Sequence, residues 1–409
     1  MMIRKQNKKS LIKKVELLAP AGNLEKLKIA YLYGADAVYA GGKKFSLRAR
    51  ASNFSLEDIK EGALFAKSLN KKLYITMNIV PHESDLKDLE DYLRFLEEVG
   101  VTGIIVSSLY IASVAKKVAP KLELHLSTQA SVSNHESIAY YEKLGFSRVV
   151  LARELDLKEI KKVVDKTNVE IEVFIHGGMC VSYSGRCMLS NYMTNRDANR
   201  GGCAHSCRWN YDIYSADNKK LNNRYFNMGS KDLNSYKLIF DLIDSGVSSL
   251  KIEGRMKSLF YIACIVRTYR GLIDDYYKYH GEKGKVDFDY YNNEILKAEN
   301  RLTSVGFLKG PVTKSEQLYN IRNENPTKDF LGIVLDYDSE TKIATIEERN
   351  YFRVGDKVEF FGPTIKNRSY VIPVMYDEDG GELDVARHPL QILRFKVPFT
   401  LHKNDMMRK

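Results

Sequence analysis

The segment Ile171-Glu-Val-Phe-Ile-His-Gly-Gly178 is a short apolar run that ends in a histidine and two glycines. Similar apolar runs recur through the first 255 residues, and amphipathic stretches such as 86–99 and 156–167 separate most of them. The runs lie at 15–19, 37–40, 73–77, 103–106, 123–126, 148–151, 171–175 and 249–252. Eight strands joined by helical crossovers predict a parallel sheet that closes into a TIM-type (β/α)8 barrel.

Polar residues follow the predicted strands, and in a TIM barrel these strand ends form the active-site face. Arg153 and Arg255 are the candidate partners of an anionic ligand, because a guanidinium pairs with a carboxylate through two hydrogen bonds. Glu253 and His176 are candidates for proton transfer. Structural alternatives stay open: each arginine fits an ordinary salt bridge, and His176 fits a supporting hydrogen bond near a bound group.

The connection between the seventh and eighth strands, about 177–247, is far longer than a normal loop, and long insertions are usually functional. It holds four of the five cysteines, Cys180, Cys187, Cys203 and Cys207, with the spacing C-x6-C-x15-C-x3-C. Four thiols in so short a stretch predict a bound metal or cluster, and ligand type alone leaves zinc and iron-sulfur open. Inert buried thiols are one alternative. Cys264 lies in an apolar helical run and is expected in the core.

Disulfides are the other alternative, but the N-terminal residues show no signal-peptide core, so we expect a reducing, cytoplasmic environment. The chain has 409 residues and a net charge of +11, which is compatible with a phosphate-rich partner. No apolar run approaches the ~20 residues of a membrane helix, so membrane insertion is not expected. Basic and aromatic residues accompany the cysteines and suit a flipped base with its phosphates, or else offset thiolate charge. They are Arg186, Arg196, Arg200, Arg208 and Trp209.

The chain divides by pattern into four parts. A basic tail covers 1–14, the barrel with its insertion covers 15–279, and a helical and loop connection covers 280–327. Short alternating strands over 328–403 predict a small C-terminal β-barrel domain. The sequence contains no G-x-S-x-G, H-E-x-x-H, P-loop or G-x-G-x-x-G motif, so simple serine or zinc peptidase machinery is not expected.

Several segments together resemble peptidase family U32, and most closely its bacterial tRNA hydroxylation branch. They include Glu16-Leu-Leu-Ala-Pro-Ala-Gly-Asn23, Tyr33-Gly-Ala-Asp-Ala-Val-Tyr39, Lys251-Ile-Glu-Gly-Arg-Met-Lys-Ser258 and Met179-Cys-Val-Ser-Tyr-Ser-Gly-Arg-Cys187. The resemblance covers nearly the whole chain, including the C-terminal β domain. It departs at Gly202, His205 and Ser108, where close relatives are expected to carry Glu, Gln and Asp.

The resemblance implies conversion of the anticodon wobble uridine of tRNA to 5-hydroxyuridine, with prephenate or a derivative as co-substrate. It makes Cys180, Cys187, Cys203 and Cys207 the ligands of a [4Fe-4S] cluster and so favours iron over zinc. The implied partners are tRNA, an electron donor and a second U32 family protein. Alternatives are a collagenase-like U32 peptidase, a hydroxylase of ribosomal RNA or a quinone precursor, and a zinc-stabilised RNA-binding module.

Overall fold

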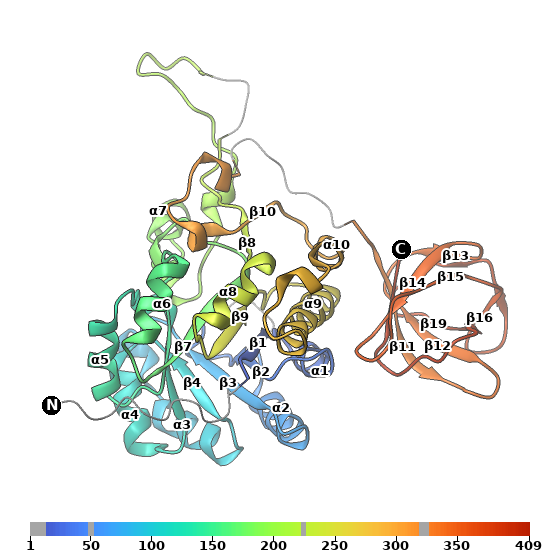
Figure 1. The fold of residues 1–409 in the computed structure, drawn as a ribbon, viewed down its shortest axis with the longest axis horizontal. Helices are drawn as coiled ribbons and strands as arrows, with labels where there is room; N and C mark the ends of the chain where they lie inside the picture. Colours follow the sequence, from blue (N-terminus) through green and yellow to red (C-terminus); the bar gives the residue numbers. More distant parts are fainter. Residues whose placement is uncertain (1–13, 48–52, 222–225, 319–326) are drawn as a thin grey trace.

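The computed structural model describes residues 14–47, 53–221, 226–318 and 327–409. Its centre is a closed parallel barrel, because β1 to β7 pair in chain order and β9 pairs with both β7 and β1 (Figure 1). The barrel strands are β1 (Glu16–Pro20), β2 (Ala37–Gly41), β3 (Lys72–Met77), β4 (Gly103–Val106), β5 (Glu123–Leu126), β6 (Arg148–Val150), β7 (Glu170–Gly177) and β9 (Ser249–Ile252). All eight predicted strands are present, and the predicted TIM-type barrel is confirmed.

Helices surround the barrel and bury their apolar faces against it. They are α1 (Leu24–Leu32), α2 (Leu56–Ser68), α3 (Leu89–Glu98), α4 (Leu109–Val118), α5 (His135–Lys143), α6 (Leu157–Asp165), α8 (Ile239–Asp244) and α9 (Leu259–Lys278). The local sequence determines where several of these helices begin. Ser55 and Asp58 form a capping box at the start of α2, which satisfies backbone N–H groups that the helix leaves free. Cys264 is 2% exposed within α9, so its predicted core position is confirmed.

The inside of the barrel carries a buried ionic layer. The Arg148 guanidinium on β6 contacts Glu16 of β1 and lies 3.2 Å from Glu172 Oε2 on β7. Glu172 is also 2.7 Å from the Lys251 ammonium on β9. Arg148 is 1% exposed and Glu172 is fully buried, so each charge depends on its partners for the solvation that water would otherwise give. This layer fixes the orientation of the strands whose ends form the site.

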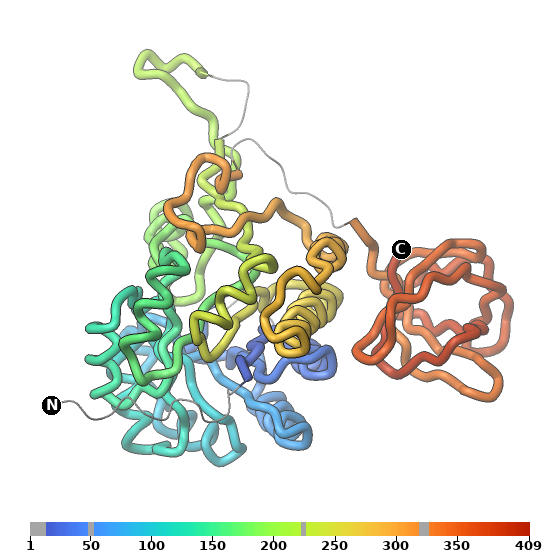
Figure 2. Tube along the Cα trace, in the orientation of Figure 1, coloured from blue at the N-terminus to red at the C-terminus, as the bar shows by residue number. Residues whose placement is uncertain are grey.

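The insertion between β7 and β9 rises above the barrel mouth (Figure 2). It contains α7 (Leu189–Thr194) and β8 (Asp232–Asn234). β8 pairs antiparallel with the end of β7 and parallel with β10 (Thr303–Ser304), so it extends the barrel wall upward. The sequence pattern over 230–245 reads as helical throughout, but only the part from residue 236 is helical. The three-residue β8 forms because the β7 end offers it a pairing edge.

The C-terminal domain is an antiparallel β structure, as predicted. Its eight-stranded sheet contains β11 (Phe330–Tyr337), β12 (Ile343–Glu348), β14 (Lys357–Phe361), β15 (Arg368–Val371), β16 (Met375–Tyr376), β17 (Glu382–Leu383), β19 (Ile392–Lys396) and β20 (Met406–Arg408). The strands β13 (Phe352–Arg353) and β18 (Val385–Ala386) form a separate pair. β20 lies between β14 and β11 and extends past residue 403, where the sequence pattern ends.

The C-terminal domain packs on the outside of the barrel, next to α1, α9 and α10 (Phe288–Leu296) (Figure 1). The rings of Phe260 on α9 and Phe330 on β11 stack with centroids 5.4 Å apart. The buried Arg408 on β20 lies 2.8 Å from Glu294 Oε2 on α10. Aromatic and ionic contacts therefore hold the two parts together.

Candidate active site above the barrel mouth

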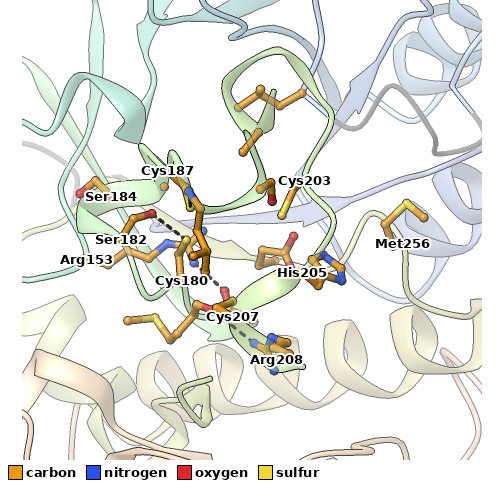
Figure 3. A pocket seen from close by; sticks show the side chains of 18 of the residues that line it. Arg153, Cys180, Ser182, Ser184, Cys187, Cys203, His205, Cys207, Arg208 and Met256 are labelled. Carbon is orange, nitrogen blue, oxygen red and sulfur yellow. Dashed lines mark hydrogen bonds between the residues drawn. The ribbon is translucent and has the colours of Figure 1, made fainter. Parts of the chain in front are cut away.

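The four clustered cysteines line one cavity of about 350 Å³ at the mouth of the barrel. Cys180 follows β7, Cys187 precedes α7, and Cys203 and Cys207 come from the return of the insertion toward the barrel. Figure 3 shows the four side chains around the same hollow, with Arg153 and Arg208 beside them. The insertion thus carries all four thiols to one cavity at the barrel mouth, and their role as ligands of a bound group stays a prediction.

Local contacts hold the cysteine loop against the strand ends. Gly177 has φ +103°, and a Cβ there would lie 2.5 Å from the Glu253 carbonyl oxygen, so the turn out of β7 requires glycine. Ser184 donates from its backbone N–H and its Oγ to the Glu154 carboxylate, at 2.8 and 2.7 Å. Arg186 donates to the Gln129 carbonyl from the other side. The loop 180–187 is thereby fixed to the ends of β5 and β6.

The four thiols provide the ligand type that zinc ions and iron-sulfur groups both use. Among the described residues, no group of three or more His, Cys, Asp or Glu side chains is gathered closely enough to hold one metal ion. A zinc site with bonds of about 2.3 Å needs its sulfurs within roughly 4 Å of each other. Thiols spread around a cavity of about 350 Å³ leave room for a multinuclear iron-sulfur group bound by four cysteines.

The thiols share one electrostatic environment. Burial, together with the nearby Cys180, Cys203 and Cys187, raises the pKa of Cys207 to about 11, and the Arg208 guanidinium opposes this rise. In the absence of a bound cation Cys207 is therefore a neutral thiol at neutral pH. Thiolate ligation at this position requires a bound metal centre, which would supply the compensating positive charge.

A second, smaller cavity of about 90 Å³ lies in the barrel mouth, and Arg153 and Glu253 line both cavities. Arg255 lines the smaller one and donates to Ser46 Oγ at 2.7 Å and Thr76 Oγ1 at 2.8 Å. Arg153 stacks over the Phe174 ring at 3.8 Å. The two arginines predicted at neighbouring strand ends thus face the same space, beside the predicted Glu253.

His176 is placed differently from the other candidates. It is buried between β7 and α9, outside the lining of both cavities, with Nδ1 3.1 Å from the Tyr269 hydroxyl. Its Nε2 lies 3.2 Å from Glu299 Oε1. Burial lowers the pKa of His176 to about 3, whereas burial and the nearby Asp232 raise the pKa of Glu299 to about 8. At neutral pH the histidine is neutral and the carboxyl group is protonated.

The predicted RNA-contacting residues differ in their surroundings. Arg208 lines the large cavity, and Trp209 beside it is 40% exposed. Arg196 donates to the Cys203 carbonyl, and Arg200 forms a 2.8 Å ion pair with Asp85. Arg186 is exposed on the cysteine loop, where its Nε is bonded to the Gln129 carbonyl.

Sequence reasoning missed several charged residues of the site. Lys257 and Arg301 line the large cavity, and both contact the buried Asp232 of β8. Lys251 lines the small cavity and is 4% exposed. The sequence did contain a signal for Lys251, because a charged lysine lies inside the apolar run of the predicted strand at 249–252. Arg301 lies in the segment just before β10, and nothing in its local sequence pointed to the site.

Comparisons with known proteins give a consistent result. The family description Peptidase family U32 matches residues 22–318, and Peptidase family U32 C-terminal domain matches residues 326–408. The tRNA hydroxylation protein P1 of Bacillus subtilis (strain 168) is 48% identical over 408 residues, covering 98% of this chain and 96% of that protein. The tRNA hydroxylation protein P of Escherichia coli (strain K12) is 32% identical over 442 residues, covering 96% and 95%.

A third relative is named for ribosomal RNA and not for tRNA. The 23S rRNA 5-hydroxycytidine C2501 synthase of Escherichia coli (strain K12) is 37% identical over 273 residues. That match covers 67% of this chain and 41% of that protein. Among the described residues, no helix has the length and apolar character needed to cross a membrane.

Proposed function

This chain belongs to peptidase family U32, and from this membership we propose that it is a tRNA-modifying enzyme that hydroxylates the anticodon wobble uridine to 5-hydroxyuridine. The observation that carries the proposal is the near-complete match to a protein named for tRNA hydroxylation, at 48% identity over 98% of this chain. The match to the ribosomal RNA enzyme covers a smaller share of both proteins, so tRNA is the favoured substrate. A location in the cytoplasm, where tRNA is found, belongs to the same proposal.

We further propose that Cys180, Cys187, Cys203 and Cys207 hold a [4Fe-4S] cluster in the large cavity. Four thiols around one cavity support this assignment. Such a cluster, when bound, supplies one-electron transfer. The chain contributes the cavity wall, and Arg208 adds positive charge next to the thiolates, which lowers the cost of gathering four negative ligands. An electron donor and a second U32 family protein are the proposed protein partners.

The smaller cavity is the proposed site of prephenate or a derivative as co-substrate. Prephenate carries two carboxylates, and Arg153, Lys251 and Arg255 place cationic side chains around this cavity. Guanidinium groups bind carboxylates through paired hydrogen bonds, so this wall suits a dicarboxylate. Glu253 lies between the two cavities and is the side chain best placed to exchange a proton with a bound ligand.

The test is complementation of a bacterial strain whose own tRNA hydroxylation gene has been deleted. Nucleosides from purified tRNA are separated and quantified by mass spectrometry. The wild-type chain is expected to restore 5-hydroxyuridine and its derivatives, and Cys180→Ala is expected not to. Cys264→Ala is the matched control, because this cysteine is buried in α9 away from the cavity, and it is expected to restore the modification.

Metal analysis of the same anaerobically purified proteins tests the cofactor. Iron and acid-labile sulfide in near-equal amounts, lost in Cys180→Ala and kept in Cys264→Ala, are expected. Zinc without iron would overturn the cluster assignment. Restored hydroxycytidine in the ribosomal RNA of a second strain that lacks its ribosomal RNA hydroxylase, with tRNA unchanged in the first strain, would overturn the tRNA assignment. Proteolysis of collagen by the purified chain, with tRNA unchanged, would support a peptidase instead.

A further inference from the structure

Three cationic side chains of the large cavity converge on one buried carboxylate. Arg208 Nη2 lies 3.3 Å from Asp232 Oδ1, and Arg301 Nη1 lies 3.5 Å from the same oxygen. Lys257 Nζ lies 3.7 Å from Asp232 Oδ2. The cations come from three separate chain segments: a 3-10 turn of the insertion, the β9–α9 connection, and the residues before β10.

The fold explains this convergence. β8 carries Asp232, and its parallel pairing with β10 places Thr303 opposite Asp232, which brings Arg301 alongside. The Asp232 backbone N–H donates to the Leu302 carbonyl at 3.0 Å. Asp232 is 4% exposed, so its carboxylate gains little from water and is stabilised by the surrounding cations. The cluster is thus built into the strand extension above the barrel mouth.

The ion pairs leave hydrogen-bond donors available in the cavity. Among the described residues, the 3.5 Å approach to Asp232 is the only polar contact of the Arg301 guanidinium, which carries five N–H donors. Arg208 donates through Nη2 alone, to Asp232 and the Met179 carbonyl. Lys257 donates to Asn300 Oδ1 at 2.8 Å. The side chains of Arg208, Lys257 and Arg301 are 16%, 18% and 23% exposed, so each reaches the cavity surface.

The charge of this cluster is unbalanced. Three cations meet the Asp232 carboxylate, Glu253 on the same cavity wall adds a second carboxylate that acts on Lys257, and Glu299 adds no negative charge while it is protonated. Partly desolvated positive charge of this kind is favourable only when an anion offsets it. Arg208 is adjacent to Cys207, and its charge also acts on that thiol. Lys257 and Arg301 belong to other segments of the wall, and the one positive charge that Asp232 and Glu253 leave unbalanced is available to a ligand.

We propose that Arg208, Lys257 and Arg301, held together by Asp232, form a subsite for one backbone phosphate of the RNA whose base enters the large cavity. The inference rests on the proposed tRNA substrate and adds the contact that positions it. A phosphate next to the reacting nucleotide accepts hydrogen bonds from several donors at once and fits a three-cation wall. Base contacts elsewhere in the cavity then select the nucleotide, while this subsite fixes its depth and orientation.

The test measures how strongly Arg301 couples to single phosphates of a synthetic anticodon stem-loop RNA. Each loop phosphate is replaced in turn by an uncharged methylphosphonate, and binding to the full chain is measured by fluorescence anisotropy. For wild type, we expect one replacement to weaken binding roughly tenfold. Arg301→Gln should bind the unmodified RNA about tenfold more weakly and should be nearly insensitive to that same replacement.

Salt dependence gives a second readout that a folding defect would not produce. Loss of one phosphate contact to a single strand should reduce the slope of log affinity against log salt concentration by about 0.7. The matched control is Arg349→Gln, because Arg349 is 22% exposed and pairs with Glu25 and Glu347, outside the large cavity. Its affinity, salt slope and phosphate sensitivity should equal those of wild type. Lys257→Gln should behave like Arg301→Gln.

Three results would overturn the inference. Equal sensitivity of wild type and Arg301→Gln to every replacement would show that no loop phosphate contacts this residue. Loss of prephenate binding in Arg301→Gln, with RNA coupling absent, would assign the subsite to a carboxylate. A wild-type chain that binds no stem-loop RNA would instead refute the proposed tRNA substrate itself, and the phosphate subsite with it.

Discussion

Replacing Glu299 by glutamine should change how the stability of the protein depends on pH. The Glu299 carboxyl is buried, and among the described residues neither oxygen makes a hydrogen bond of good geometry, although His176 Nε2 lies 3.2 Å from Oε1. Its nearest titratable neighbours are His176, Asp232, Lys257, Tyr261 and Tyr269. Burial first, and then Asp232, raise the pKa of this group to about 8, although Lys257 opposes the rise.

The direction in which pH changes the stability follows from proton binding. Between the unfolded pKa of a glutamate, about 4.3, and the folded pKa of about 8, the folded chain holds a proton that the unfolded chain releases. Stability is therefore lost as pH rises through this range. The lowered pKa of His176 acts oppositely, because its contribution is lost as pH falls below about 6.5. In the unfolded chain this histidine is still half protonated at pH 6.5, so it offsets a small part of the slope just above that pH. Glu299 alone should remove about 1.5 kcal/mol between pH 6.5 and 8.

Glutamine mimics the protonated carboxyl, so Glu299→Gln should remove this slope. The assay is urea unfolding at pH 6.5, 7.0, 7.5 and 8.0, followed by far-UV circular dichroism and by fluorescence of Trp209, the single tryptophan. The stability of the variant relative to wild type should rise by about 1.5 kcal/mol across the range. Glu340→Gln, exposed in the β11–β12 turn, should keep the wild-type slope. Parallel pH profiles for wild type and Glu299→Gln would refute the reasoning.

Two further stability predictions concern the domain interface and a helix start. Arg408→Met should destabilise the protein by about 3 kcal/mol in thermal unfolding, because it leaves Glu294 and Glu359 without their buried partner. The loss is at the low end for a buried pair, since Lys297 also contacts both carboxylates. Ser55→Ala should cost about 1 kcal/mol by removing the α2 capping box, whereas Ser55→Asp should cost little.

The barrel could be predicted because its evidence is local. Each strand is a short apolar run, and the crossovers between most of them are amphipathic, so eight repeats point to one topology. β8 could not be predicted from the sequence, because three residues are too few to show the alternation of apolar and polar side chains that marks a strand. These residues form a strand only because the free edge of β7 pairs with them. The two-residue strands β13 and β18 were missed for the same reason. Pairing across the fold, rather than local preference, defines these elements.

The site could be predicted where its residues are recognisable by their type or by their spacing. The cysteine spacing identified the cavity wall, and strand-end positions identified Arg153, Glu253 and Arg255. The environment of His176 depended on Glu299, which lies 123 positions later and reaches it only through the packing of the segment after α10. Whether His176 transfers protons in the reaction stays a prediction, and Glu299 is the group it would exchange with.

Charge distribution bears on which part of the molecule meets RNA. The chain has 63 lysines and arginines against 52 acidic residues, yet residues 327–409 contain 13 against 14. The excess of positive charge therefore belongs to residues 1–326, which include the barrel and its insertion.

The small C-terminal β domain has a shape that is common among nucleic-acid binders. RNA affinity depends on cations placed near phosphates, so this domain lacks the charge for that role. Its aromatic and ionic packing against α9 and α10 fits a different role, support of the wall that carries Arg301. RNA contact should therefore concentrate around the cysteine cavity.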